Sequence, residues 1–463
     1  MIKYAGSFRD PSGFIFTANG CLCRQVNALY KEHYDHLMGS GLYDAFVEND
    51  FLIPHSEIDT TNIDDHGYKI IAPTVIEFVS YPYEWCFSQL KDAALLTLSI
   101  QKMALEYGMV LKDASAFNIQ FQNSKPIFID TLSFEIYEEG QPWIAYKQFC
   151  QHFLAPLAIM AHVDARLGHL LQSYIDGIPL SLAKKLIPFK KKLNAGIFLH
   201  LCLHAKMQEK YSNVKKIKNT DSSNLNVSKN ALLGIISSLQ KTISKIHWNI
   251  PKTEWIHYYQ STNYSDVGFE EKKEVVRGYL ARINPGVVWD IGANTGCFSR
   301  IASSLGATTI AMDMDIGAVE WNYRQSRKKD SAPLTPLVVD IASPTPGLGW
   351  HGAERESLID RGPADCVLAL AIIHHLVITN NVPLNLVASF LAAISRYLII
   401  EFVPKNDSQV QRMLANRVDI FNEYTIERFE SECKKHFEIM DKYILRDSDR
   451  VIFLMKNISA AQE

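Results

Sequence analysis

The sequence has no marked excess of charge of either sign and no long apolar run. Lysine and arginine together number 47 and aspartate and glutamate 50, so the formal net charge is −3 and no broad basic field favours a nucleic acid as partner. No apolar stretch approaches the roughly 20 residues that a membrane-spanning helix needs. The first residues, MIKYAGSFRDP, lack the apolar core of a secretory signal. We therefore expect a cytoplasmic protein without membrane insertion.

Cysteine patterns typical of metal sites are also missing. The 8 cysteines are scattered along the chain, and only Cys21 and Cys23 lie close together. Their spacing is not that of a zinc site. We therefore predict no metal site, and we expect the thiols to be reduced side chains of a cytosolic protein.

The length of the chain and a change in its composition predict more than one domain. The 463 residues are 47% hydrophobic, which is enough for several cores. Residues 207–230, MQEKYSNVKKIKNTDSSNLNVSKN, are polar and basic, as is typical of a linker. We predict an α+β domain over residues 1–205, a linker with a connecting helix over 206–250, and a Rossmann-like domain over 251–463.

After the predicted linker, strand-like and helix-like segments alternate. Five apolar segments have the composition of buried strands: GVVWDI, TTIAMD, TPLVVD, DCVLALAII and YLIIEF. The last segment, FEIMDKYILRDSDRVIFLMKN, predicts two strands around a polar turn. Alternation of this kind predicts an α/β fold, with a parallel sheet that has helices on both faces. The final two strands would complete a seven-stranded sheet with an antiparallel edge.

The stretch VVWDIGANTGCFSRIA predicts a strand, a tight glycine loop and a helix. Its glycines do not match the G-x-G-x-x-G pattern of dinucleotide-binding loops. Asp290 comes just before the loop glycines Gly292 and Gly296, and Asp313 and Asp340 end the next two predicted strands. Three carboxylates around one crevice would repel a pyrophosphate. They favour a ligand that has a positive charge, ribose hydroxyls and an exocyclic amine.

S-adenosylmethionine carries all of these groups, and its single carboxylate could face the helix start after Gly296. Over residues 255–457 this arrangement resembles class I S-adenosylmethionine-dependent methyltransferases. The resemblance implies that Asp313 binds the ribose diol and that Asp340 binds the adenine amine, with Ile341 beside the ring. It also implies a methyl-transfer site after the fourth strand. The predicted cofactor-binding residues are Asp290, Gly292, Asn294, Gly296, Asp313, Met314, Asp340, Ile341 and Leu370.

Four further stretches resemble a narrower group of bacterial methyltransferases that includes nodulation-protein relatives. These stretches are PTPGLGWHGAERESLIDRG, ALAIIHHL, IIEFVPKND and YPYEWCFSQLKDAALLTL. The resemblance implies a methyltransferase but does not identify the methyl acceptor. Asp315, in contrast, is predicted to be the N-cap of a helix that begins at Ile316 rather than a second ribose ligand.

Two histidines and a glutamate are the predicted catalytic residues. His374 and His375 follow the fourth strand, and one imidazole could remove a proton from an oxygen or nitrogen nucleophile. Glu401, at the end of YLIIEF, is predicted to bind the acceptor or to act as a base. The alternative for all three is a packing or structural role. AIIHHL lacks the Asn/Asp-Pro-Pro-aromatic motif of amino-methylating relatives that act on DNA, which argues against adenine-N6 methylation.

The first half of the chain faintly resembles kinase-like phosphotransferases. Asp113 precedes Asn118 by five positions and Asp130 ends the next apolar strand, a spacing similar to that of a catalytic Asp and the metal-binding Asn and Asp of kinases. The resemblance covers residues 10–200, but there is no glycine-rich phosphate loop, and Leu111 stands where kinases have a histidine. We expect a kinase-like scaffold that has lost phosphotransfer and helps to select the acceptor. An unrelated α+β domain, a bifunctional kinase–methyltransferase and a non-catalytic S-adenosylmethionine-binding module are the alternatives.

Overall fold

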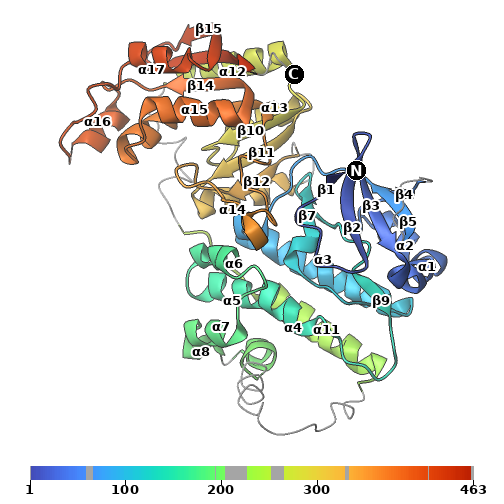
Figure 1. Ribbon diagram of the computed structural model, residues 1–463. Helices are drawn as coiled ribbons and strands as arrows, with labels where there is room; N and C mark the ends of the chain where they lie inside the picture. The colour runs from blue at the N-terminus through green and yellow to red at the C-terminus, as the bar shows by residue number, and fades with distance from the viewer. Residues whose placement is uncertain are drawn as a thin grey trace. The chain divides into compact units, whose positions relative to one another are not determined.

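The chain divides into two compact units in the computed structural model shown in Figure 1. The units are Met1–Asn249 with Leu348–Arg355, and Ile250–Gly347 with Glu356–Glu463. The structure describes residues 2–58, 66–192, 194–203, 227–251, 265–328, 333–415 and 417–459. Residues 204–226, which include the part of the predicted linker before residue 227, therefore lie outside the described residues. Within the described ranges, no helix has the length and apolar character needed to cross a lipid bilayer.

The first unit begins with an antiparallel sheet of five strands in the order β1-β2-β3-β5-β4. The strands are β1 (Ile2–Lys3), β2 (Gly13–Ala18), β3 (Cys21–Asn27), β4 (His55–Glu57) and β5 (Gly67–Pro73). β2 and β3 form an antiparallel hairpin. Its turn residues, Asn19 and Gly20, both have positive φ, at 51° and 78°. Asparagine and glycine adopt this conformation more easily than other residues.

Helices and two small hairpins make up the rest of the first unit. The paired strands are β6 (Met109–Leu111) with β9 (Phe134–Ile136) and β7 (Ile119–Gln122) with β8 (Lys125–Phe128). The main helices are α1 (Lys31–Gly39), α2 (Leu42–Glu48), α3 (Phe87–Glu106), α4 (Tyr146–Phe149), α5 (Ala155–His162), α6 (Leu170–Ser173), α7 (Leu180–Leu186) and α11 (Lys229–Lys245). The named strands of this unit pair antiparallel throughout, so the unit is of the α+β type rather than the α/β type.

Two segments belong to a different part of the structure from the one that the sequence predicted. Helix α11, from the connecting segment, packs along α3 inside the first unit. Residues 348–355, from within the predicted Rossmann-like range, also belong to the first unit. There, Glu354 accepts two hydrogen bonds from the guanidinium of Arg9, at 2.5 and 2.9 Å. Neither association could be inferred from composition, because both depend on contacts between residues far apart in the chain.

The second unit contains the predicted seven-stranded sheet, in the order β12-β11-β10-β13-β14-β16-β15. The strands are β10 (Val287–Ile291), β11 (Thr308–Asp313), β12 (Thr335–Val338), β13 (Ala364–Ala369), β14 (Ser395–Phe402), β15 (Phe437–Ile444) and β16 (Val451–Asn457). The first five strands in this order are parallel, and β16 and β15 complete the sheet as an antiparallel hairpin. The predicted alternation of strands and helices is confirmed.

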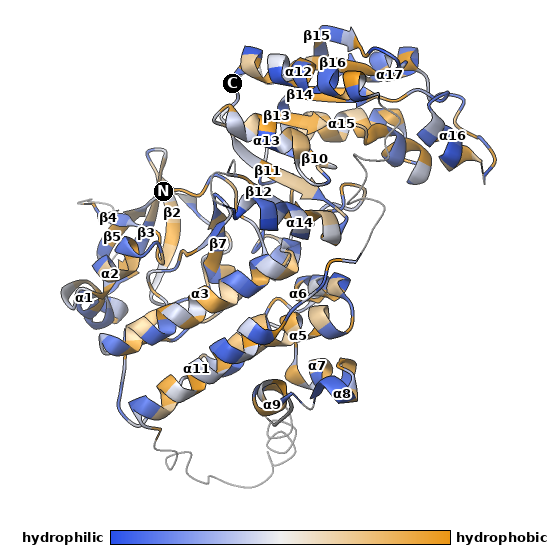
Figure 2. Ribbon diagram, turned by 180° about the vertical axis from the view of Figure 1, so that it is seen from behind, coloured by the Kyte–Doolittle hydropathy of each residue, from blue (hydrophilic) through white to orange (hydrophobic). Residues whose placement is uncertain are grey.

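Helices cover both faces of this sheet. Because side chains alternate along a strand, Leu454 of β16 joins a buried cluster with α12 and α13, while its neighbour Phe453 contacts Phe429 of α17 on the opposite face. The helices are α12 (Asp266–Ile283), α13 (Cys297–Ser304), α14 (Ile316–Ser326), α15 (Leu384–Ile394), α16 (Ser408–Leu414) and α17 (Ile426–Cys433). In Figure 2, the central strands β13 and β14 are strongly apolar, as expected for strands buried on both faces.

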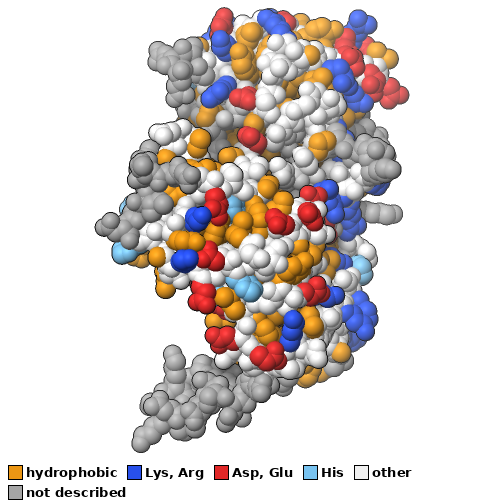
Figure 3. Space-filling model, turned by 90° about the vertical axis from the view of Figure 1, so that its right-hand side faces the viewer, with side chains coloured by type: hydrophobic (Ala, Val, Ile, Leu, Met, Phe, Trp, Pro, Cys, Tyr) orange, Lys and Arg blue, Asp and Glu red, His pale blue; other side chains and the backbone are white. Residues whose placement is uncertain are grey.

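The surface view agrees with the balanced composition of the chain. Figure 3 shows one face of the molecule, on which acidic, basic and apolar side chains are interspersed. On this face, no region of one charge is broad enough to indicate a polyanionic partner.

Candidate active site

A pocket of about 450 Å³ lies at the carboxyl ends of the parallel strands in the second unit. The volume is within the range of small-molecule sites. β10 is central, with β11 on one side and β13 on the other, so the strand order reverses at this point. Open α/β sheets bind ligands at such a point. The predicted cofactor-binding residues that line the pocket are Asp290, Gly292, Asn294, Asp313, Met314, Asp340, Ile341 and Leu370.

Three carboxylates from three different strand ends line this one pocket. Asp290 lies near the end of β10, Asp313 ends β11, and Asp340 follows β12. Asp290 is only 3% exposed and accepts a hydrogen bond from the hydroxyl of Ser299 at 2.6 Å. Burial raises the pKa of both Asp290 and Asp313 to about 6. A cationic ligand would favour their ionised forms.

The glycine loop folds back onto Asp313. The backbone N–H of Asn294 donates to one oxygen of the Asp313 carboxylate at 2.7 Å, and the backbone N–H of Asp315 donates to the other at 2.8 Å. Each oxygen keeps a second lone pair for a ligand. Asp315 itself accepts a hydrogen bond from the N–H of Ala318, at 2.7 Å. Its predicted role as the N-cap of α14 is confirmed, although it also borders the pocket.

Gly296 lies outside the pocket lining. It has a φ of 80° and is the N-cap residue of α13. A β-carbon at this position would lie 2.5 Å from the side-chain amide of Asn322 on α14. Gly296 therefore permits the loop to pack closely against α14. Gly292, in contrast, lines the pocket, and a β-carbon there would lie 2.9 Å from Ile372.

The two predicted histidines occupy different environments. Their rings lie 4.3 Å apart, but only His375 lines the pocket, while His374 is 2% exposed. Burial lowers the pKa of both imidazoles, and that of His374 falls furthest. Within the described residues, Nδ1 of His374 has no hydrogen-bond partner. His375 begins a π-helical turn that extends to Thr379, an irregularity that is frequent at functional sites.

Glu401 is placed outside the pocket lining, in a buried group of charges. Its side chain is 0% exposed, and its carboxylate lies 2.7 Å from Nζ of Lys272 and 3.6 Å from Nη1 of Arg450. Arg450 also pairs with Asp407 at 2.8 Å. Glu401 is predicted from the sequence to bind the acceptor or to act as a base, but these contacts give its carboxylate two cationic partners in the protein interior.

Lys272 is a pocket residue that the sequence analysis missed. It lies on α12 and lines the pocket together with Phe269 of the same helix. Its position could have been noticed, because Lys272 shares a helix face with Val276 and Leu280, which belong to the core. A lysine in register with core residues indicates either a buried ion pair or a ligand contact, and spacing alone does not distinguish them.

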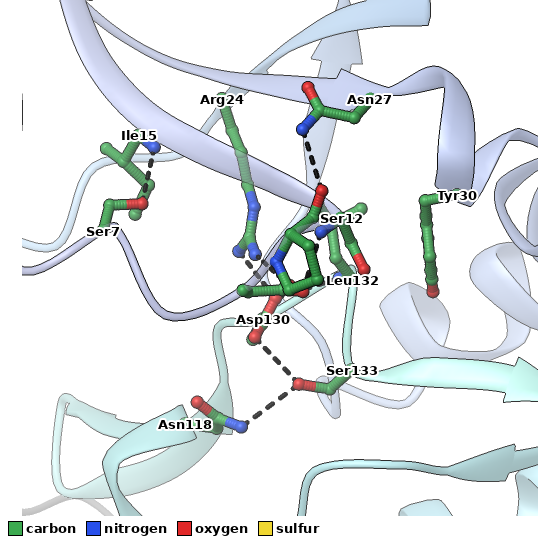
Figure 4. A network of polar contacts seen from close by, with 12 residues as sticks. Ser7, Ser12, Ile15, Arg24, Asn27, Tyr30, Asn118, Asp130, Leu132 and Ser133 are labelled. Carbon is green, nitrogen blue, oxygen red and sulfur yellow. Dashed lines mark hydrogen bonds and ion pairs between the residues drawn. The ribbon is translucent and has the colours of Figure 1, made fainter. Parts of the chain in front are cut away.

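In the first unit, Asn118 and Asp130, two of the three kinase-like positions, both contact the hydroxyl group of Ser133 (Figure 4). Asp130 pairs with Nη1 of Arg24 at 2.6 Å, and its second oxygen accepts a hydrogen bond from the hydroxyl of Ser133 at 2.8 Å. Asn118 donates to the same hydroxyl oxygen at 3.1 Å. Burial and the nearby Asp130 raise the pKa of Asp113. The Asp130 charge is thus compensated by an arginine of the chain itself.

Comparison with known proteins places the chain in a family. No family model matches it. Over 456 residues, covering 97% of this chain and 95% of the relative, it is 33% identical to nodulation protein NoeA of Rhizobium meliloti. The chain belongs to the NoeA family. The predicted relationship to nodulation-protein relatives is confirmed by this NoeA match, which extends over nearly the whole of both sequences.

Several solved structures resemble part of this NoeA-family chain. Magnesium protoporphyrin IX methyltransferase from Synechocystis PCC 6803 is 18% identical over 44% of this chain and 93% of that chain, with a TM-score of 0.32. The N-methyltransferase NodS from Bradyrhizobium japonicum WM9 is 9% identical, over 42% and 98% of the two chains, with a TM-score of 0.31. The bifunctional kinase-methyltransferase WbdD is 16% identical, over 45% and 43%, with a TM-score of 0.31.

Proposed function

We propose that this NoeA-family protein is an enzyme that transfers a methyl group from S-adenosylmethionine to an oxygen or nitrogen atom of an acceptor. The observation that supports this most directly is that Asp290, Asp313 and Asp340 line one pocket although they belong to the ends of three different strands. A pocket rich in carboxylates at the switch point of the sheet favours a cationic nucleoside over a diphosphate. The first unit would assist in selecting the acceptor.

The residues around the pocket fit the parts of this cofactor. Asp313 presents two oxygens that backbone N–H groups already orient, which suits a ribose diol. Asp340, beside the apolar side chain of Ile341, suits an adenine with its exocyclic amine. Asp290 lies in β10, just before the glycine loop and beside β13. Its carboxylate could therefore pair with the ammonium group of the cofactor. When bound, S-adenosylmethionine supplies the activated methyl group.

The chain's own contribution to methyl transfer is alignment and exclusion of water. Leu370 and Ile372 form the apolar wall after the fourth strand, and His375 borders the same space. Burial lowers the pKa of His375, so the imidazole is neutral at pH 7. In this form it can accept a proton from a hydroxyl or an ammonium group of the acceptor. We therefore assign the predicted base role to His375 rather than to His374.

Substitution of His375 by alanine is expected to lower the turnover number by about 10²-fold or more, the usual contribution of a general base. The affinity for S-adenosylhomocysteine should stay within about twofold, because His375 borders the acceptor side of the pocket. Tritium-methyl transfer to an extract measures the first quantity and calorimetry the second. The variant His374→Ala is the matched control. We expect it to be less stable than the natural chain, while each folded molecule keeps most of its turnover. Full activity of the His375 variant would exclude the base role.

Cofactor binding is expected to depend on pH in a defined direction. The folded pKa values of Asp290 and Asp313 are raised to about 6 by burial, and a cation binds their ionised forms. Affinity for S-adenosylmethionine should therefore be greatest above pH 7 and fall as pH drops through 6, by up to about tenfold per pH unit for each carboxylate. Calorimetry between pH 5 and 8 measures this. Asp290→Asn should flatten the profile, whereas a flat profile for the natural chain would contradict the electrostatic account.

Two measurements separate the alternatives for the whole chain. Calorimetry with S-adenosylmethionine and, separately, with Mg-ATP should give heat with the first only, because Arg24 already neutralises Asp130. Heat with both would favour a bifunctional kinase–methyltransferase. Tritium-methyl labelling of a cell extract, followed by sizing of the product, then distinguishes an enzyme from a non-catalytic binding module. Binding without any labelled product would favour the module.

A further inference from the structure

The charges around the pocket are unevenly distributed. Four of the described lining residues are aspartates, namely Asp290, Asp313, Asp315 and Asp340, while Lys272 is the only lysine or arginine among them. S-adenosylmethionine has a single anionic group, the carboxylate of its amino acid half. In a pocket with this lining, that carboxylate would be repelled by the aspartates unless it lay against a cation.

Lys272 is held in a fixed position. Its side chain is 3% exposed, and its ammonium lies 2.7 Å from the carboxylate of Glu401 and 4.8 Å from the ring centre of Phe298. Burial lowers the pKa of Lys272, but the adjacent Glu401 charge acts in the opposite direction. Glu401 therefore favours the charged ammonium inside the protein.

Lys272 lies toward the Asp290 end of the pocket. Burial raises the pKa of the Asp290 carboxyl, and the nearby Lys272 charge acts in the opposite direction, whereas the groups besides burial that act on Asp313 are backbone N–H donors and Asp315. Under the proposed function, Asp313 and Asp340 take the nucleoside. The amino acid half then extends toward Asp290, which suits the ammonium, and toward Lys272, which suits the carboxylate.

We propose that Lys272 binds the carboxylate of the amino acid half of S-adenosylmethionine, with Glu401 as its positioning residue. This inference rests on the proposed function. It replaces the expectation that the carboxylate faces the helix start after Gly296, because Lys272 brings a cation to the pocket lining, whereas the first turn of α13 contributes only the apolar Phe298 to it. It also explains why an ion pair is present at this buried position. A buried ion pair contributes little stability compared with apolar residues of similar volume, so stability alone does not account for Lys272 and Glu401.

The test compares S-adenosylmethionine with its decarboxylated form, which lacks only the carboxylate. The full chain should bind the first at least about tenfold more tightly, the usual effect of a hydrogen bond to a charged group. In Lys272→Gln this preference should fall to about twofold or less. The double variant Lys272→Met/Glu401→Gln should show the same loss. Because it removes both charges of the pair, it does not leave the carboxylate of Glu401 buried without Lys272. Both ligands are measured on the same sample, so a partly unfolded variant changes both signals and leaves their ratio intact.

Lys273→Met is the matched control. Lys273 is the next residue on α12, pairs with Glu270 at 2.7 Å and is absent from the pocket lining, so the natural preference should persist in this variant. A preference that survives unchanged in either folded Lys272 variant would overturn the inference, as would equal binding of both ligands by the natural chain. Failure of the natural chain to bind either ligand would instead overturn the proposed function, and the inference would fall with it.

Discussion

Replacing Glu401 by alanine is expected to destabilise the second unit by about 3–5 kcal/mol, the usual cost of removing one partner from a buried ion pair. The change leaves Lys272 and Arg450 in the interior without their shared counter-charge, and both side chains are only 3% exposed. For a unit of this size, the midpoint of thermal unfolding should fall by about 6–20 °C. Calorimetric or circular dichroism melting of the full chain measures the effect.

An exposed ion pair provides the comparison for Glu401. Arg428 and Glu423 lie 3.1 Å apart with 49% and 78% exposed side chains. Glu423→Ala should therefore change stability by no more than about 1 kcal/mol. If Glu401→Ala melted like the Glu423 variant, the Glu401 carboxylate would not be the buried counter-charge described above, and its predicted role in binding or base chemistry would become the better explanation of its position.

Asp313→Ala is expected to weaken the binding of S-adenosylmethionine by about 1–3 kcal/mol, the cost of leaving hydrogen-bonding groups without a partner. This corresponds to a dissociation constant about 5- to 150-fold higher. The alanine removes the acceptor for the ribose hydroxyls and also frees the N–H groups of Asn294 and Asp315, which now fix the glycine loop. Calorimetric titration of the variant measures the loss.

Asp365 is a matched control for Asp313. It is the second residue of β13, at the amino ends of the parallel strands, and its carboxylate accepts hydrogen bonds from the backbone N–H groups of Gly286 and Val287 at 3.0 and 2.9 Å. Asp365→Ala therefore removes the same kind of contact far from the pocket, and we expect lower stability with unchanged affinity for the cofactor. Equal affinities in the natural chain and the Asp313 variant would remove Asp313 from the cofactor site.

The sheet and the aspartates at the carboxyl ends of its strands were predictable, because both depend on local sequence patterns. Apolar runs such as those of β13 and β14 report burial on two faces directly, and the register of a strand fixes where its last residues lie. Asp290 and Asp313 therefore had to lie near the same edge once their strands were parallel neighbours. The N-cap role of Asp315 was also local, since it depends only on the helix that follows.

Other features depended on contacts that the sequence does not encode locally. Lys272 and Glu401 are separated by 129 positions, and only the folded sheet brings them together. Glu401 is the last residue but one of its strand and Asp313 is the last residue of its own, so nearly the same pattern describes a buried counter-charge and a pocket carboxylate. Of His374 and His375, only the second lines the pocket, and it begins a π-helical turn. Two identical neighbours in the sequence do not show which of them will face the pocket.

The assignment of residues 348–355 to the first unit means that neither half of this protein is one continuous piece of chain. Division after residue 249 would deprive the amino-terminal piece of Glu354 and leave the Arg9 guanidinium without that acceptor. The other piece would carry an eight-residue segment without the unit to which it belongs. A gene fusion or deletion at a single junction therefore could not separate one complete unit from the other. To study the first unit by itself, residues 348–355 would first have to be joined to it.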